Sequence, residues 1–575
     1  MSELISYKDY SQSLVSFFKF LKNNKNYNEL FLKSIRIKKN KDLILIPISQ
    51  IHLNDNFIIK KLCDWRNKNS NVFIQNKKTN IKKTRIWMKE NLLDVKDKIL
   101  FLVLKNGKTP IGHIGFSNCL NKKMNFEIDN VIKGEKDDNK KIFSEVLEGL
   151  IDWANQTFYV NSFFIKVIQN NLRAINFYKK NNFKSIELVE SKNKNPYKLM
   201  FFKETDNKKE FISTAGPSIS QKEISYVNDA VSTGWNNNAN NYIKKLENKF
   251  ASYLNCKYAI ATSSCTGAMH IALMSLGIKK GDEVIVPNIT WVATANAIAY
   301  VNATPVFADI NLKDWVIDCD KVEKLITKKT KAIIPVHLYG QPCNMDKINK
   351  IAKKHNLYVV EDAAPSIGAK FKNKKCGTFG NFGAFSFQGA KLLVSGEGGM
   401  LVTNNKNLYL KALKISDQGR SSKKKFFIDA LGLKYKMSNI QAALALAQLE
   451  RVEELIALKR RIFSWYEKYL KNLDSISLNY ETPNTKSIYW MTSIVLNQKA
   501  KINRDQLIKN LLNNKVDSRP VFPELSSFKY WSKNNVNSLK NSKYLSSNGI
   551  NLPSGVCLKE HHVKRVCVII KKYLS

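Results

Sequence analysis

The chain has 575 residues, which is too long for one ordinary domain and suggests three to four compact units. Hydrophobic residues make up 44% and charged residues 25% of the sequence, a globular composition that excludes a disordered chain. The formal net charge of +45 comes mostly from lysines spread along the whole chain. Because nucleic-acid patches concentrate arginine and aromatic residues on one element, we expect no nucleic-acid partner and leave open an attraction to phosphorylated substrates.

The cysteines give no sign of a metal site or a disulfide framework. The nine cysteines form no C-x-x-C pair and have no metal-like spacing with the seven histidines. We therefore expect reduced thiols, no metal and a cytoplasmic location. No apolar run reaches the roughly 18 residues that a membrane span needs, and the first residues lack signal-peptide features, so no membrane partner is expected.

Residues 1–41 are expected to form a helical leader. Leu14, Phe17, Phe18 and Leu21 recur at the spacing of one helix face. A short amphipathic helix needs a partner surface, so this one should dock on the body of the protein.

The pattern of apolar and polar residues in 42–204 predicts a first α+β domain. The runs "DLILIPIS", "KILFLVLKNG", "TPIGHIGFSN" and "MNFEIDNVI" indicate strands, and helix-period runs follow them. In "VIQNNLRAINFYKKNNF", Val167 to Phe183, a strand end leads into an amphipathic helix and a terminal phenylalanine. With "CDWRNKNSNVF" around Trp65, this segment resembles the GNAT N-acetyltransferases.

This resemblance implies acetyl-coenzyme A as a co-substrate. It places Asn171 and Gly134 among the residues that bind acetyl-coenzyme A. Gly134, in "VIKGEKDDNKKIF", is the single glycine that matches the family's pyrophosphate loop. Asn182 stands where the family has a glycine, and asparagine can adopt the left-handed conformation.

The resemblance also assigns the acetyl-transfer chemistry. Tyr178 would protonate the departing thiolate, although a tyrosine on such a helix is also compatible with a simple core position. Glu127 or Asp129, on the strand before the loop, is a candidate base for the acceptor amine.

The polar stretch "SKNKNPYKLMFFKETDNKKEF" places the main domain boundary near residue 205. After it, short apolar strands such as "EVIVPN", "TPVFADI", "KAIIPVH" and "LYVVEDA" alternate with helical patterns, which indicates an α/β domain with a mostly parallel sheet covered on both faces. We expect residues 205–575 to divide into a large domain, about 230–455, and a small α+β domain, about 456–575.

Ligands bind at the carboxyl ends of strands in such sheets. Thr266 lies in a small-residue turn before a helix, where a phosphate could bind. Trp291 follows a strand end and could stack on a flat ring, and Asp362 ends another strand. Lys391 lies in a weakly charged stretch, where desolvation would make its amine nucleophilic. Together these groups meet the needs of pyridoxal phosphate, although a helix cap for Asp362 and a core position for Trp291 are alternatives.

The second segment resembles the DegT/DnrJ/EryC1/StrS sugar aminotransferases, which have the fold-type-I pyridoxal phosphate fold. The resemblance runs through "GDEVIVPNITWVATANAIAYVNATPVFADI", "VVEDAAPSIGA", "GTFGNFGAFSFQGAKLLVSGEGGMLVTN" and "YKMSNIQAALALAQLERV". It implies that Lys391 forms an imine with the cofactor, that Asp362 pairs with the pyridine nitrogen and that Trp291 stacks on the ring. The implied phosphate ligands are Thr266, Gly267 and Ser386.

Three positions depart from the family pattern. Cys265 replaces a glycine, Pro365 replaces a glutamine, and Lys434 replaces an asparagine that reaches the neighbouring subunit's phosphate. Lysine can serve a phosphate as a point charge, so we expect Lys434 to do so in a homodimer or larger even oligomer. Because Lys391 is kept, where dehydrating relatives have histidine, the resemblance favours transamination.

The leading hypothesis is that the two segments catalyse consecutive reactions. L-glutamate would donate an amino group to a nucleotide-linked 4-keto-6-deoxy sugar, with a 3-keto sugar as the alternative, and the first domain would N-acetylate the product. Alternatively, the first domain acetylates proteins, or it is a non-catalytic scaffold.

Overall fold

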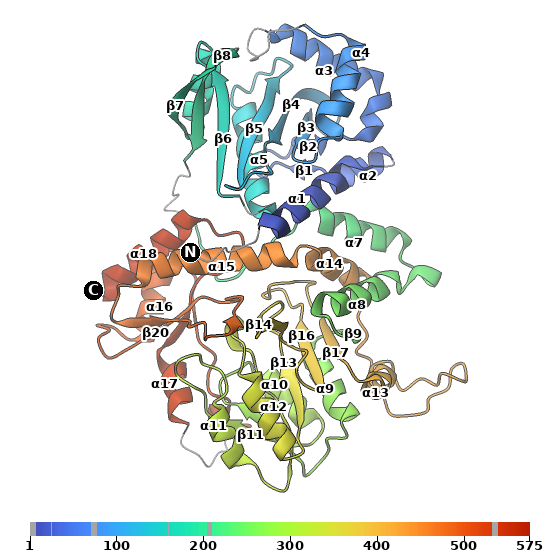
Figure 1. Cartoon of the computed structure of the whole chain (residues 1–575), viewed down its shortest axis with the longest axis vertical. Helices are drawn as coiled ribbons and strands as arrows, with labels where there is room; N and C mark the ends of the chain where they lie inside the picture. The colour runs from blue at the N-terminus through green and yellow to red at the C-terminus, as the bar shows by residue number, and fades with distance from the viewer. Residues whose placement is uncertain are drawn as a thin grey trace. The chain divides into compact units, whose positions relative to one another are not determined.

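The computed structural model describes residues 7–24, 26–70, 78–158, 160–191, 194–203, 210–531 and 539–574 (Figure 1). The chain forms two compact units. The first comprises residues 1–206 and 218–228, and the second comprises residues 207–217 and 229–575. The predicted boundary near residue 205 lies outside the described residues. No helix in the described ranges combines the length and the apolar composition needed to cross a bilayer.

The first unit contains an eight-stranded sheet with the order β1-β2-β3-β4-β5-β6-β8-β7. Its strands are β1 (Ile35–Arg36), β2 (Leu43–Pro47), β3 (Ile99–Lys105), β4 (Thr109–Ser117), β5 (Asn125–Lys133), β6 (Ser162–Ile168), β7 (Phe183–Ser191) and β8 (Lys194–Phe202). Neighbouring strands are antiparallel except for β5 and β6, which pair in parallel. The predicted α+β class is confirmed.

Helices cover both faces of this sheet. They are α1 (Tyr7–Lys22), α2 (Tyr27–Leu32), α3 (Asn56–Lys68), α4 (Ile81–Met88), α5 (Ile142–Thr157) and α6 (Leu172–Lys180). Leu102 of β3 packs in one core with Trp65 of α3, whereas the ring of Phe101 lies 5.2 Å from that of Trp153 in α5. Because adjacent strand residues point to opposite faces, α3 and α5 lie on opposite sides of the sheet.

The predicted N-terminal helix is present as α1. Leu14, Phe17, Phe18 and Leu21 are all buried, at 1%, 4%, 1% and 0% exposure. The Tyr10 hydroxyl donates to the carbonyl of Cys119 at 2.6 Å. The apolar face of α1 therefore docks on the first unit, as its spacing predicts.

The second unit is built on a seven-stranded sheet with the order β11-β10-β12-β13-β16-β17-β9. Its strands are β9 (Tyr258–Thr262), β10 (Glu283–Pro287), β11 (Thr304–Ala308), β12 (Thr330–Ile333), β13 (Tyr358–Asp362), β16 (Phe382–Ser386) and β17 (Gly399–Thr403). The sheet is parallel except for β17, which is antiparallel to both of its neighbours. A mostly parallel sheet is what the sequence predicts.

Helices also cover both faces of this second sheet. The helices in this part of the chain are α8 (Asn241–Leu254), α9 (Cys265–Ser275), α10 (Ala293–Tyr300), α11 (Cys319–Val322), α12 (Met345–Lys354), α13 (Lys406–Ser416) and α14 (Asn439–Leu449). The residues of α7 (Gln221–Thr233), which precedes them, are divided between the two units. Ala384 of β16 packs in a core with the apolar face of α9. The next residue, Phe385, contacts Phe250 of α8 with ring centroids 5.0 Å apart. Strand alternation thus places α8 and α9 on opposite faces.

The C-terminal part of the second unit is α+β. An antiparallel sheet has the order β18-β20-β22-β21, and its apolar residues share a core with helices α15, α16 and α18. The bounds are α15 (Val452–Leu470), β18 (Ile476–Leu478), β20 (Ser493–Leu496), α16 (Arg504–Asn513), β21 (Arg519–Pro520), α17 (Lys540–Asn548), β22 (Gly549–Asn551) and α18 (Glu560–Leu574). A separate small sheet joins β14 (Lys370–Phe371), β15 (Lys374–Lys375) and β19 (Thr485–Lys486).

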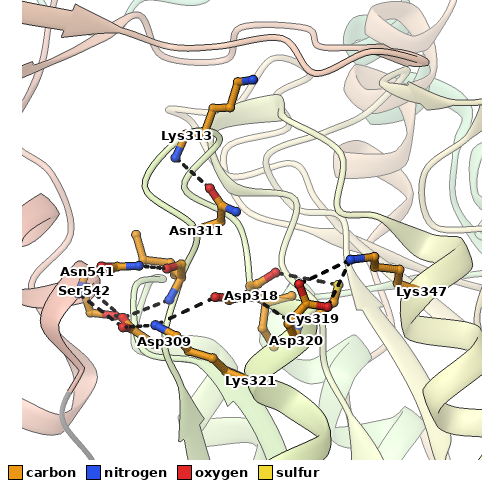
Figure 2. Close-up of polar contacts among 12 residues, drawn as sticks. Asp309, Asn311, Lys313, Asp318, Cys319, Asp320, Lys321, Lys347, Asn541 and Ser542 are labelled. Carbon is orange, nitrogen blue, oxygen red and sulfur yellow. Dashed lines mark hydrogen bonds and ion pairs between the residues drawn. The ribbon is translucent and has the colours of Figure 1, made fainter.

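A buried aspartate ties the large sheet to this C-terminal part (Figure 2). Asp309 follows β11 and is 2% exposed. Its Oδ1 accepts hydrogen bonds from the N–H and the hydroxyl of Ser542 (2.8 and 2.7 Å), while its Oδ2 accepts from the N–H of Asn541 (3.2 Å). Nζ of Lys321 forms an ion pair with Oδ2 of Asp309 at 2.9 Å. Asp309 therefore satisfies the free N–H groups that begin helix α17.

Candidate active sites

The predicted ligand-binding residues of the second unit follow strands that end at one edge of its sheet. Asp362 on β13 pairs with Ala384 on β16. Ser386, two residues further along β16, pairs with Gly399, and Gly399 pairs with Thr262 at the end of β9. The ends of β9, β13 and β16 therefore lie next to one another, as a ligand at this edge requires.

Lys391 lies just beyond β16 and is half-buried. Its Nζ is 3.8 Å from the ring centroid of Trp490. Burial lowers the pKa of Lys391 to about 8, against the opposing influence of Asp362 and Cys265. The neutral, nucleophilic fraction of this amine near neutral pH is therefore much larger than that of an exposed lysine.

Asp362 is held in place by hydrogen bonds on both carboxylate oxygens. It is 5% exposed. Its Oδ2 accepts from the hydroxyl of Thr294 at 2.7 Å, and its Oδ1 accepts from the N–H of Ala364 at 3.1 Å. A buried carboxylate is best compensated by a cation, and a protonated pyridine nitrogen is one. The site thus fits pyridoxal phosphate at this position.

The neighbouring carboxylate, Glu361, has a different role. It is fully buried and 3.0 Å from Nε2 of His337. Backbone N–H groups donate to its two oxygens from Gly377 (2.7 Å), Phe379 (2.6 Å) and Gly380 (2.8 Å). These bonds anchor the turn before β16, so Glu361 supports the sheet while Asp362 faces the Lys391 environment.

The predicted phosphate ligands lie at the start of α9 and the end of β16. Thr266 is half-buried in the first turn of α9, where helix N–H groups favour anions. The N–H of Gly267 donates to the Ser264 hydroxyl at 3.0 Å, which caps the helix. The Ser386 hydroxyl accepts from the N–H of Gln388 at 3.3 Å, and a hydroxyl that accepts one hydrogen bond can also donate its own proton. Thr266 and Ser386 thus offer hydroxyl donors.

Trp291 and Lys434 are placed on the surface of the second unit. Trp291 follows β10, is 58% exposed and has its ring 5.7 Å from that of Phe522. A large exposed aromatic face of this kind is available for stacking. Lys434 is exposed, and its Nζ lies 3.6 Å from Oδ1 of Asp417. Its reach to a second subunit stays a prediction.

Two residues of this site escaped sequence reasoning. Thr294 belongs to the same "NITWVATANA" motif as Trp291, and its hydroxyl was a usable signal. Trp490 gave no signal, because it is 100 residues from Ala390, whose carbonyl accepts its indole N–H at 2.8 Å.

In the first unit, β5 and β6 share only a short ladder. Their parallel pairing joins Asn125–Glu127 to Ser162–Phe164, although β5 continues to Lys133 and β6 to Ile168. Backbone groups of these described strands that lack a ladder partner can bond an extended ligand, and the arm of an acyl-coenzyme A carries amide groups.

Tyr178 and Asp129 belong to the same environment. Tyr178 is 5% exposed and packs against Phe183 with ring centroids 5.6 Å apart. Burial raises the pKa of Tyr178, and the charge of Asp129 raises it further. The phenol is therefore protonated, as a proton donor must be. Asn182 adopts the expected left-handed conformation, with φ of 68°.

The predicted acetyl-coenzyme A ligands are engaged within the protein. The N–H groups of Gly134 and Glu135 both donate to the carbonyl of Ile111, at 2.9 and 3.2 Å. A Cβ on Gly134 would lie 2.1 Å from the indole of Trp65, so this glycine permits close packing. Asn171 caps α6 by accepting from the N–H of Ala174 at 3.1 Å. This loop offers a pyrophosphate fewer free N–H groups than a helix start normally does.

Neighbouring side chains hold both of the candidate bases. Glu127 forms an ion pair with Lys166 at 2.8 Å and accepts a hydrogen bond from Asn118. The Asp129 side chain is 35% exposed and lies 3.3 Å from Nζ of Lys98. It also accepts hydrogen bonds from the N–H and the side-chain amide of Asn130, at 2.7 and 2.8 Å. The charge of Asp129, not that of Glu127, acts on Tyr178. Its proximity to Tyr178 favours Asp129.

Among the described residues, Glu210, His561 and His562 bring potential metal ligands within 4.8 Å of one another. However, Nδ1 of His562 accepts the N–H of Lys559 at 3.2 Å, so its ring proton resides on Nε2. Nε2 lies 3.1 Å from Glu210 and donates to it. A protonated nitrogen has no lone pair for a metal, and we assign Glu210 and His562 to holding the start of α18.

Comparison with known proteins matches both units to families. Residues 217–571 match the DegT/DnrJ/EryC1/StrS aminotransferase family, and residues 42–184 match the acetyltransferase (GNAT) domain. The GDP-perosamine synthase of Escherichia coli O157:H7 is 40% identical over 370 residues, which is 64% of this chain and 99% of the relative. The GDP-perosamine synthase of Caulobacter vibrioides is 39% identical over 364 residues, covering 63% and 98%.

Solved structures agree with this assignment. A putative sugar aminotransferase of Streptococcus pneumoniae, in its PLP form, has a TM-score of 0.60 at 25% identity and covers 64% of this chain and all (100%) of its own. A DegT/DnrJ/EryC1/StrS aminotransferase of Brucella abortus has a TM-score of 0.58 at 28% identity, covering 62% and 95%. The chain therefore belongs to the DegT/DnrJ/EryC1/StrS aminotransferase family and carries an N-terminal GNAT acetyltransferase domain.

Proposed function

We propose that the second unit uses pyridoxal phosphate to transfer an amino group from L-glutamate to a nucleotide-linked 4-keto-6-deoxy sugar. The observation that carries this proposal is the presence at one sheet edge of a lysine of lowered pKa, Lys391, and a buried carboxylate, Asp362, whose charge acts on it. The perosamine synthases among the relatives support a 4-keto substrate and favour a GDP-linked one. A 3-keto sugar is the alternative substrate.

The roles of the residues follow from their chemistry. The bound cofactor supplies an electrophilic carbon and accepts electron density during transfer. Lys391 would hold the cofactor through its neutral amine, and its free amine would move the proton at the reacting carbon. Asp362, oriented by Thr294, would keep the pyridine nitrogen protonated. Trp291 would offer its face to the ring, and Thr266 and Ser386 would donate hydrogen bonds to the phosphate.

In this proposal the first unit acetylates the new amine. The unprotonated amine attacks the thioester carbonyl of acetyl-coenzyme A, the C–S bond breaks, and the thiolate takes the proton of Tyr178. Asp129 would accept the proton that the amine loses. The short β5–β6 ladder and the protonated state of Tyr178 support this step.

A second candidate is supported by the pyrophosphate loop. The N–H groups of Gly134 and Glu135 are already bonded to Ile111, so a non-catalytic domain also fits the first unit. A domain that acetylates a protein would need the same acetyl-coenzyme A site and would differ only in its acceptor. These candidates differ in what happens to the sugar.

Mass spectrometry of reaction products distinguishes them. Purified protein with pyridoxal phosphate and L-glutamate is given GDP-, UDP- or dTDP-linked keto sugars, with and without acetyl-coenzyme A. We expect an amino sugar in the first case and an acetylated amino sugar in the second. An amino sugar that never gains an acetyl group, with the first unit folded, would leave the scaffold or protein-acetylating role.

A further inference from the structure

Helix α15 contains a lysine that is almost completely buried. Lys459 is 4% exposed, and its Nζ donates to the carbonyl oxygens of Trp490 (2.8 Å) and Ser554 (2.5 Å). Burial lowers the pKa of Lys459 to about 7. Both acceptors are neutral backbone groups, so these hydrogen bonds are a main compensation for removing the amine from water.

One of these acceptors belongs to the tryptophan that contacts Lys391. The face of the Trp490 ring lies 3.8 Å from Nζ of Lys391. Its indole N–H donates to the carbonyl of Ala390 at 2.8 Å. A single side chain therefore contacts both the amine of Lys391 and the peptide that precedes it.

The main chain of Trp490 is fixed on both sides. Its N–H donates to the carbonyl of Tyr339 at 2.9 Å, and its carbonyl accepts from Lys459. The second acceptor of Lys459, Ser554, also binds the N–H of Thr492 through its hydroxyl at 2.8 Å. Lys459 thus ties the segment that carries Trp490 to the turn at Ser554.

We propose that Lys459 is a positioning residue for Lys391, acting through Trp490, whose indole it holds against the Lys391 amine. This inference deepens the proposed function, because it bears on cofactor attachment only if Lys391 is the attachment point. A cation over an aromatic face is stabilised, so loss of the contact favours the neutral amine. Loss of a positive charge would by itself raise the pKa of Lys391, so the sign of the shift separates a charge effect from loss of the contact.

The test measures the pKa of Lys391 in the full chain without cofactor. Acetic anhydride is applied in pulses at a series of pH values, and peptide mass spectrometry follows modification of Lys391. The midpoint of this pH dependence is the pKa of Lys391. We expect it to fall by about one pH unit in Lys459→Met, because a desolvated cation–π contact is lost. The control is Lys468→Met on the same helix, which removes an exposed lysine paired with Glu560 at 2.8 Å and should leave the midpoint unchanged.

A double-mutant cycle tests the route through Trp490. Trp490→Leu alone should lower the midpoint by a similar amount, and adding Lys459→Met to it should cause no further fall. The proposal is overturned if the midpoint is unchanged or raised in folded Lys459→Met. It is also overturned if Lys459→Met lowers the midpoint equally in the unmodified protein and in Trp490→Leu.

Lys459→Gln, which keeps an N–H donor, should show a smaller fall if Lys459→Met does not fold. An unchanged midpoint in Trp490→Leu also overturns the proposal and does not depend on any variant of Lys459. The labelling needs neither cofactor nor sugar, so failure of the proposed function would not be mistaken for failure of this inference.

Discussion

Asp362 ends β13, Lys391 lies just beyond the adjacent strand β16, and the charge of Asp362 acts on the Lys391 amine. Desolvation lowers the pKa of Lys391, whereas the negative charge of Asp362 raises it. A pKa of about 8 is the resulting balance. The site thus keeps an amine that is reactive near neutral pH beside a carboxylate that can pair with a pyridine nitrogen.

The rate at which the cofactor attaches should rise in proportion to the neutral fraction of Lys391. Because only the unprotonated amine attacks an aldehyde, the rate of appearance of visible absorbance should rise with pH, with a midpoint near pH 8. An exposed lysine would give a midpoint near 10.4. Stopped-flow absorbance on cofactor-free protein measures this rate. Lys391→Ala should give no such band, and the exposed-lysine control Lys411→Ala should match the unmodified protein.

Tyr178 provides the corresponding test in the first unit. Tyr178→Phe removes the proton donor but keeps the ring that packs against Phe183. We expect acetylation of the amino sugar to slow by about 10²- to 10⁴-fold while amination is unchanged. Coupled product assays by mass spectrometry measure both rates. Equal acetylation rates in the two proteins would exclude Tyr178 as the acid and support its core role.

At the scale of elements, strand ends and helix starts position the groups that matter. β13 and β16 carry Asp362 and Ser386 to one edge, and α9 begins there with Thr266. In the C-terminal part, α17 begins on Asp309, which follows β11 (Figure 2). One carboxylate thereby links the large sheet to a helix more than 200 residues away in sequence.

Asp309→Asn should destabilise the second unit. An amide can accept only on one atom, so the N–H groups of Asn541 and Ser542 and the Lys321 ammonium lose a shared partner. We expect a loss of about 2 kcal/mol in the free energy of unfolding, measured by urea denaturation. Asp320→Asn is the control, because Asp320 is 80% exposed where it pairs with Lys347. A cost for Asp309→Asn no larger than for the control would contradict this assignment.

Some elements of the site could be predicted from the sequence and others could not, for physical reasons. The strand patterns around Asp362 and Lys391 are local, so their sheet edge could be predicted from the sequence. Trp490 and Lys459 reach the site only through folding of the C-terminal part, and no local pattern marks them. The bonding of Gly134 to Ile111 likewise depends on β4 and could not be predicted from the loop alone.

At the scale of the whole molecule, each of the two units carries its own candidate site. The second contains Lys391, Asp362 and Trp291 with the predicted phosphate ligands Thr266 and Ser386, and the first contains Tyr178 and Asp129. Their reactions can follow one another, because the amine made by one is the nucleophile needed by the other. Effective acetylation then requires only that the product be oriented at the thioester.

Assembly should complete the second unit's site. Lys434 is exposed in this chain, and we expect it to reach the phosphate in a neighbouring subunit of a homodimer or larger even oligomer. Lys434→Ala should therefore weaken cofactor binding about tenfold without changing the oligomer, since it removes one charged contact. Equilibrium dialysis and sedimentation measure the two quantities. An active, strictly monomeric protein would contradict this expectation.

Transfer of isotopic nitrogen tests the central claim most directly. The full-length protein, loaded with pyridoxal phosphate, is incubated with ¹⁵N-labelled L-glutamate and a GDP-linked 4-keto-6-deoxy sugar, and the nucleotide sugar is analysed by mass spectrometry and NMR. Our account predicts ¹⁵N bonded to C-4 of the sugar, and its loss in Lys391→Ala. Absence of the label from this sugar and from its UDP- and dTDP-linked counterparts, in protein that holds the cofactor, would contradict it.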